Sequence, residues 1–159
     1  MDKLSQILWR ERELLEHLAY ELEVERLVLA SGRTKWLARA TRDIDETLSD
    51  IRSTEVLRAV AADEAAEQLG MTPNPSLVGL AEAVGDPWRG ILLEHRDAFL
   101  SAAREIAELS EENKGLLSAG FRSAQEALLS IGGTSTEGYT HDGRSVAEAP
   151  RRRLVDRSL

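Results

Sequence analysis

The chain has 159 residues, of which 42% are hydrophobic, 4% aromatic and 30% charged, and its formal net charge is −8. This length suits one domain with a buried core, and the scarcity of aromatic residues favours slender packed helices over a thick globular core. The negative charge argues against duplex nucleic acid or an anionic membrane as a partner, and the absence of cysteine excludes disulfides and thiolate metal sites.

The first predicted helix spans about residues 2–30. Leu8, Leu15, Leu22 and Leu29 recur at a heptad spacing, which is typical of one face of an amphipathic helix. We expect the helix to end at Ser31-Gly32, because glycine readily takes the left-handed position after a helix. This N-terminal region has neither the apolar core of a signal peptide nor a run that could span a bilayer. We therefore expect a cytoplasmic protein without membrane insertion.

The second predicted helix spans about residues 34–69. Leu37, Ile44 and Ile51 repeat the heptad spacing, and the short break before them predicts an antiparallel hairpin with the first helix. Pro73 and Pro75 prevent the second helix from continuing, because proline lacks the amide that helix propagation needs.

A short connecting helix is predicted over about residues 76–84, with Ser76 as its N-cap, followed by a long helix over about residues 87–131. The apolar face of the long helix starts with Leu92, His95, Phe99, Ala102, Ile106, Leu109, Asn113 and Leu116. The sequence thus predicts an all-α, antiparallel bundle of three long helices with a short connecting helix. Residues 1–131 would form the helical domain, and residues 132–159 a flexible tail that carries little apolar surface.

The sequence contains no convincing catalytic, metal or cofactor site. Glu13 and His17 are four residues apart, whereas the di-iron motif of helical bundles needs a spacing of three. His95 falls on the apolar face, where we expect a half-buried histidine hydrogen-bonded to a neighbour. Glu11 and Glu25 interrupt the leucine face of the first helix and suggest register control or partner contact. We predict a protein that is not an enzyme and needs no cofactor and no metal.

The helix lengths predict an uncovered apolar surface. If the long helix returns along the second one, residues after about Leu117 extend past the end of the hairpin. Their apolar face continues nevertheless, and exposed apolar area costs about 25 cal/mol per Å² in water. Such a surface would bind a partner helix, drive self-association or remain frayed until a partner binds, and the alternative is that a second copy or the folded-back tail covers it. Gly115 and Gly120 make this end of the helix adaptable, since each costs about 1 kcal/mol relative to alanine.

Several segments, taken in order, resemble the FlgN family of flagellar export chaperones. They are the leucine-rich first helix, the alanine-rich segment at 61–70, the Met71-Thr72-Pro73 turn before Ser76-Leu77, and the sequence Glu112-Asn113-Lys114-Gly115-Leu116-Leu117. The resemblance covers about residues 4–131.

The resemblance implies a cytoplasmic chaperone that holds hook-associated proteins of the hook–filament junction before type III export. It also implies the export apparatus as a further partner, and the C-terminal helix as the part that binds clients. Carried over to this chain, the partner-binding residues are Asn113, Leu116, Leu117, Phe121, Ala124, Leu128 and Ile131. The alternative is a structural coiled-coil protein that homodimerises through its C-terminal helix, and a weak homodimer is also compatible with a chaperone.

Overall fold

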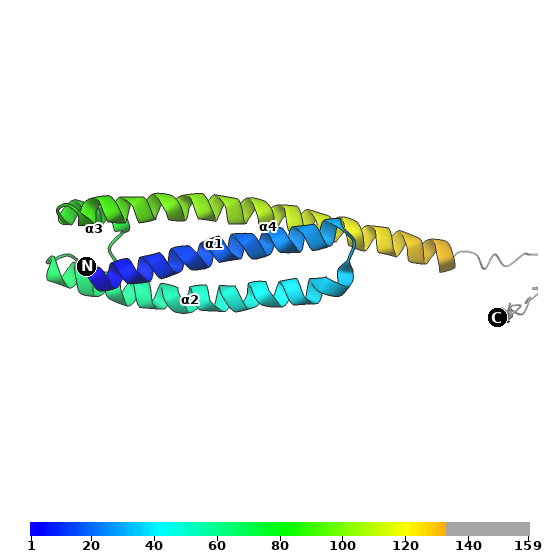
Figure 1. Cartoon of the computed structure of the whole chain (residues 1–159), viewed down its shortest axis with the longest axis horizontal. Helices are drawn as coiled ribbons and strands as arrows, with labels where there is room; N and C mark the ends of the chain where they lie inside the picture. Colours follow the sequence, from blue (N-terminus) through cyan, green and yellow to red (C-terminus); the bar gives the residue numbers. More distant parts are fainter. Residues whose placement is uncertain (133–159) are drawn as a thin grey trace, which may run out of the picture. The chain divides into compact units, whose positions relative to one another are not determined.

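A computed structural model of the protein describes residues 1–132, and all of its regular structure is helical (Figure 1). The elements are α1 (Asp2–Ala30), the 3-10 turn η1 (Thr34–Trp36), α2 (Leu37–Gln68), α3 (Leu77–Ala83) and α4 (Trp88–Gly132). The prediction of an all-α fold is confirmed for these residues. The chain divides into two compact units, Met1–Gly120 and a second that begins at Phe121. The tail predicted over residues 132–159 lies outside the described residues except for Gly132.

The helix ends follow the local sequence signals. Gly32 and Gly70 have φ angles of 65° and 66° and follow the last turns of α1 and α2. Both therefore occupy left-handed positions that disfavour residues with a Cβ atom. The Ser76 hydroxyl oxygen accepts a hydrogen bond of 3.0 Å from the amide of Gly79, as a helix N-cap does. The second helix differs slightly from expectation: Thr34 begins a single 3-10 turn, which often precedes an α-helix, and α2 starts at Leu37.

Helices α1 and α2 lie side by side and run antiparallel (Figure 1). The Lys3 ammonium contacts the Glu64 carboxylate at 2.7 Å, near the start of α1 and the end of α2. At the other end, the Thr41 hydroxyl donates a hydrogen bond of 3.0 Å to Glu25. At each end of the pair, a residue near the start of one helix contacts a residue near the end of the other. This confirms the predicted hairpin.

Buried Glu11 pairs with α2 midway along this hairpin. Its carboxylate lies 2.8 Å from the Arg58 guanidinium, and its side chain is 6% exposed. Burial raises the pKa of Glu11, the positive charge of Arg58 opposes that shift, and the negative charge of Glu55 adds to it. A buried charge is stabilised only when its partner lies opposite it, so this pair favours one register of α1 against α2. This agrees with the role in register control that the sequence suggested for Glu11.

Helix α4 runs in the same direction as α1 within the first unit. Near the start of both helices, the Trp9 and His95 rings meet edge to face with centroids 4.8 Å apart. Further along, the Arg26 guanidinium contacts the Glu112 carboxylate at 2.8 Å. Residue numbers that rise together show that these segments are parallel, which is the direction required when α4 returns after an antiparallel hairpin.

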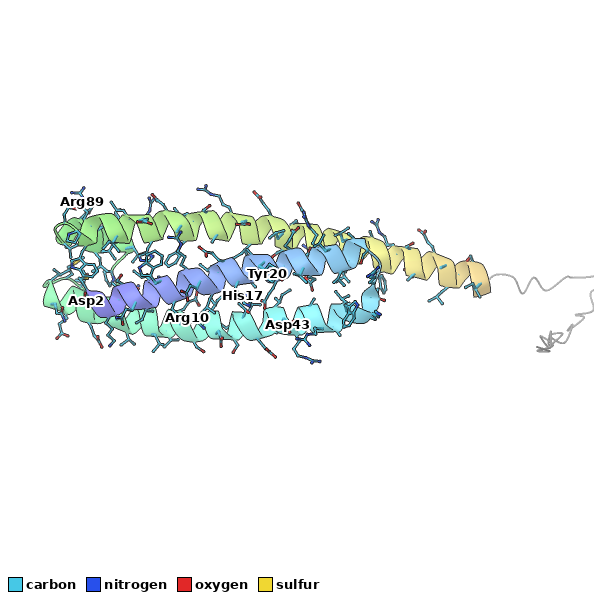
Figure 2. All side chains as sticks on the ribbon, viewed as in Figure 1. Asp2, Arg10, His17, Tyr20, Asp43 and Arg89 are labelled. Carbon is cyan, nitrogen blue, oxygen red and sulfur yellow. The ribbon has the colours of Figure 1, made fainter. Side chains whose placement is uncertain are left out.

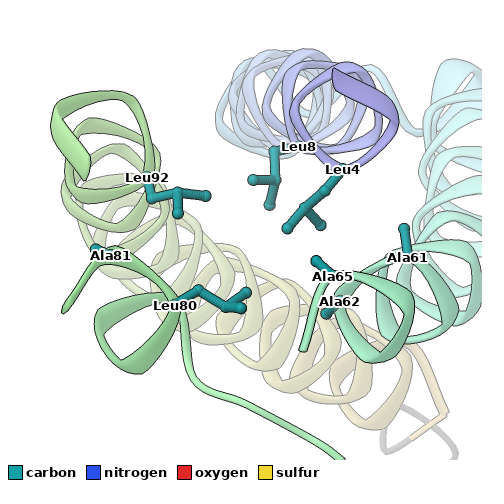
Figure 3. Packing of buried hydrophobic residues seen from close by; sticks show 8 residues of the cluster. All are labelled: Leu4, Leu8, Ala61, Ala62, Ala65, Leu80, Ala81 and Leu92. Atoms are coloured by element: carbon teal, nitrogen blue, oxygen red, sulfur yellow. The ribbon is translucent and has the colours of Figure 1, made fainter. Parts of the chain in front are cut away.

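Two clusters of buried side chains hold the first unit together. At one end, leucines of α1, α3 and α4 meet the alanine-rich part of α2 (Figure 3), and the residues are Leu4, Leu8, Ala61, Ala62, Ala65, Leu80, Ala81 and Leu92. Small alanine side chains allow neighbouring helices to approach closely here. The second cluster consists of Leu14, Leu18, Leu22, Ile44 and Ile51, with Ile106 and Leu109 of α4 packed against it.

His95 is fully buried rather than half-buried. Its side chain is 1% exposed between the rings of Trp9 and Phe99, and within residues 1–132 neither ring nitrogen has a hydrogen-bond partner. The expected hydrogen bond to a neighbour is therefore absent among the described residues, because aromatic side chains surround the ring. Burial lowers the pKa of His95, and the positive charge of Arg12 lowers it further.

Acidification is expected to destabilise the protein through His95. Unfolded histidine takes up a proton near pH 6.5, whereas the native pKa is lower, so stability present at neutral pH is lost as pH falls through the native pKa. Glu11 acts oppositely, since its raised pKa adds stability as pH falls through its native pKa. Thermal melts at pH 7.5 and 5.5 should therefore show a smaller loss for His95→Leu than for the unmodified protein. Parallel pH profiles would rule out a contribution from His95.

Candidate partner-binding site

The C-terminal part of α4 carries large apolar side chains that are exposed to solvent. In the second unit, Phe121 and Leu128 are each 71% exposed, and Leu129 is 68% exposed. Ala124 and Ile131 are exposed as well. Residues 121, 124, 128 and 131 follow the spacing of a single helix face. A helix face on which consecutive turns expose large apolar side chains is uncommon on protein surfaces and is typical of a protein-binding segment.

In the first unit, the expected site residues Leu116 and Leu117 are on α4 and are partly exposed, at 36% and 55%. Leu117 also lines a groove of about 210 Å³ that α1, the start of α2 and α4 form together. The apolar part of the groove comes from Leu22, Leu29, Leu37 and Leu117. It has the size of one large side chain rather than of a cofactor.

Asn113 differs from the other expected site residues because it is buried between α1 and α4, with 5% of its surface exposed. Its amide nitrogen donates a hydrogen bond of 2.9 Å to the Leu22 carbonyl oxygen and one of 3.0 Å to the Glu25 carboxylate. In the free protein, Asn113 joins α1 to α4 and has little exposed surface that a partner could contact. Its amide oxygen is buried and has no hydrogen-bond partner within residues 1–132, and Asn113 is one of the residues that line the groove beside Leu117.

The sequence pattern assigned the α1 and α2 leucines of this groove to the core and did not identify them as binding residues. Leu29 and Leu37 continue the heptad spacings that predict core positions, yet both are only partly buried. One signal was available: both residues flank the Ser31-Gly32 break, and helix ends next to a turn bury less surface than helix centres. Whether these leucines form a groove therefore depends on the position of the α1–α2 turn relative to α4. The apolar pattern of one helix does not specify that position.

The described residues show no arrangement suited to catalysis by a metal ion. Within 1–132, no three histidine, aspartate or glutamate side chains are placed to hold a metal. In the same range, no helix combines the length and the apolar character needed to traverse a lipid bilayer. What the C-terminal half of α4 offers chemically is apolar surface.

Comparison with known proteins identifies the family of the chain. The family model described as FlgN protein matches residues 1–147, which is most of the sequence. No curated protein and no solved structure gives a match. The matched range includes all helices and the apolar face of α4 described above. The chain therefore belongs to the FlgN family, a family of flagellar export chaperones.

Proposed function

We propose that this chain is a cytoplasmic chaperone that binds hook-associated proteins of the hook–filament junction, prevents their premature assembly and assists their type III export. Membership of the FlgN family supports a role in flagellar export in general. The observation that carries the specific proposal is the exposure of Phe121 and Leu128 on one helix, at 71% each. Hook-associated proteins would supply amphipathic helices whose apolar faces cover these side chains. No catalytic step is involved.

The proposed scaffold is an antiparallel bundle of α1, α2 and α4 within a helical domain of residues 1–131. The contacts of Arg26 with Glu112 and of Asn113 with Leu22 support it, since they join α4 to the hairpin. Leu116, Leu117, Phe121, Ala124, Leu128 and Ile131 would contact the client, while Asn113 would contribute by holding α4 in place. The groove beside Leu117 would receive one large apolar side chain of the client helix.

Titration calorimetry of the full chain with purified hook-associated proteins tests the proposal. Binding of one of these proteins, and not of flagellin prepared in the same way, is the expected result. Light scattering after size-exclusion chromatography separates the proposal from the structural alternative. A stable dimer that does not dissociate when the client is added would indicate a coiled-coil protein that homodimerises through α4.

Hydrogen exchange is expected to locate the client on α4. In the free protein, amides after Phe121 should exchange faster than those near Leu109, because Leu109 packs on the second core cluster whereas residues 121–131 are exposed. Adding the client should slow exchange in residues 121–131 specifically. Equal protection at Leu109 and Leu128 in a proven monomer, unchanged by the client, would contradict this assignment.

A further inference from the structure

A second, chemically different surface lies between α1 and α2. It is an open groove of about 760 Å³ that extends along α1 from Arg10 to Val24, about 20 Å at 1.5 Å per residue. Figure 2 labels Arg10, His17 and Tyr20 on its α1 side and Asp43 on its α2 side. The carboxylates that line the groove are Glu13, Glu21, Asp43, Glu46 and Asp50.

Among the described residues, 1–132, only part of this negative charge is neutralised. The Arg10 guanidinium lies 3.5 Å from Glu13, and the Arg39 guanidinium lies 3.5 Å from Asp43. Arg10 and Arg39 are the two arginine side chains that line the groove, and no lysine lines it. The remaining three carboxylates, Glu21, Glu46 and Asp50, have no lysine or arginine partner within residues 1–132. The groove therefore carries excess negative charge between two helices.

Glu21 is the carboxylate that most needs an external partner. The residue is 8% exposed, and one of its oxygens lies 3.2 Å from the His17 ring nitrogen. Its other oxygen, Oε2, is buried and has no hydrogen-bond partner within the described part of the chain. A buried oxygen without a donor is energetically costly, so a donor supplied by a bound molecule would remove that cost.

Tyr20 adds an aromatic surface beside this carboxylate. Its side chain is 64% exposed, and its ring stacks on that of His17 with centroids 6.2 Å apart and planes 20° apart. A guanidinium group can stack on such a ring while donating hydrogen bonds to a neighbouring carboxylate, which an ammonium group does less well. Tyrosine and carboxylates at one place are therefore suited to arginine.

We infer that the α1–α2 groove binds an arginine-bearing, positively charged segment of a partner polypeptide, with Glu21 Oε2 as the main acceptor. The length of the groove suits several turns of a helix better than a small ion, and the described residues contain no cluster placed to hold a metal. The net negative charge of the chain would speed the encounter. This surface uses α1 and α2 and shares no residue with the client site on α4, so a client and a basic partner could bind together.

The probe is a synthetic helical peptide of alanine and arginine, capped at both ends, titrated into the full chain at low salt. We expect it to bind, and a peptide with citrulline in place of arginine not to bind, because citrulline keeps the shape but lacks the charge. Glu21→Gln should weaken binding about fivefold, which corresponds to a loss of about 1 kcal/mol. Glu82→Gln removes the same charge from an exposed site on α3 outside the groove and should change affinity less than about twofold.

Two results would overturn the inference. Equal losses for Glu21→Gln and Glu82→Gln would mean that only the net charge attracts the peptide. Displacement of the peptide by spermidine at an equal concentration of positive charge would mean that the groove takes small polycations. Asp50→Asn provides a second test if Glu21→Gln melts early, because Asp50 is exposed and lines the same groove. It should also weaken binding more than Glu82→Gln, while client binding through α4 stays unchanged in all three variants.

Discussion

Phe121→Ala and Leu128→Ala are each expected to weaken binding of the hook-associated client at least tenfold, measured by titration calorimetry. A few large apolar side chains usually supply most of the affinity of an interface, and a tenfold loss corresponds to about 1.4 kcal/mol. Because both side chains are 71% exposed in the free protein, their removal should change the melting temperature by little. Loss of affinity without loss of stability is the result that distinguishes a binding surface from a core.

Val56→Ala is a matched control for these two variants. Val56 is an apolar residue, 64% exposed, but it is on α2 rather than on α4. It should leave both client affinity and melting temperature unchanged. Phe121→Ala with normal affinity and a much lower melting temperature would place Phe121 in a core and remove α4 as the client site.

Asn113→Asp is expected to destabilise the protein by about 3 kcal/mol, or roughly 10 °C in melting temperature. The substitution keeps the shape of the side chain but replaces a donor with a carboxylate. That carboxylate would face the Leu22 carbonyl oxygen and the Glu25 carboxylate, which accept hydrogen bonds of 2.9 and 3.0 Å from Asn113. The new carboxylate and that of Glu25 would repel each other in this buried site without a compensating partner.

The pH dependence of this variant provides an internal check. Burial next to Glu25 should raise the native pKa of the new aspartate, so stability is regained as pH falls through that pKa and the carboxylate takes up a proton. Ser118→Asp is the matched control, because it adds the same charge at an exposed position on α4. If both variants melt at the same temperature, Asn113 does not join α4 to α1 as the structure has it.

Local sequence was sufficient for the helices and most of their ends, and the start of α2 is an exception because a 3-10 turn spans residues 34–36. Heptad leucines in residues 2–30 predict α1, and Ser31-Gly32 predicts where it stops, because periodicity and glycine conformation are properties of one segment. Ser76 capped its helix for the same reason. The all-α class and the antiparallel hairpin follow from these segments and from the shortness of the break between them.

The role of individual polar residues depended on tertiary structure. Asn113 and His95 fall on the apolar face of one helix; the family resemblance assigned Asn113 to a binding surface, and the helical pattern assigned His95 to a half-buried position. The structure places Asn113 against the Leu22 carbonyl oxygen and His95 between aromatic rings without a hydrogen-bond partner among the described residues. A helical face shows that a residue points inward, but the neighbouring helix decides whether a donor or a ring is there.

The sequence by itself determined the helices, their turns and the apolar face of α4, since each depends on residues a few positions apart. Only the tertiary structure decided that α1 and α2 enclose an acidic groove around Glu21 and that Leu22, Leu29 and Leu37 meet Leu117. Those surfaces join residues from different helices, and their register is set by buried pairs such as Glu11 with Arg58. Helical periodicity records which way a side chain faces along one axis and contains no information on which residue of another helix lies opposite it.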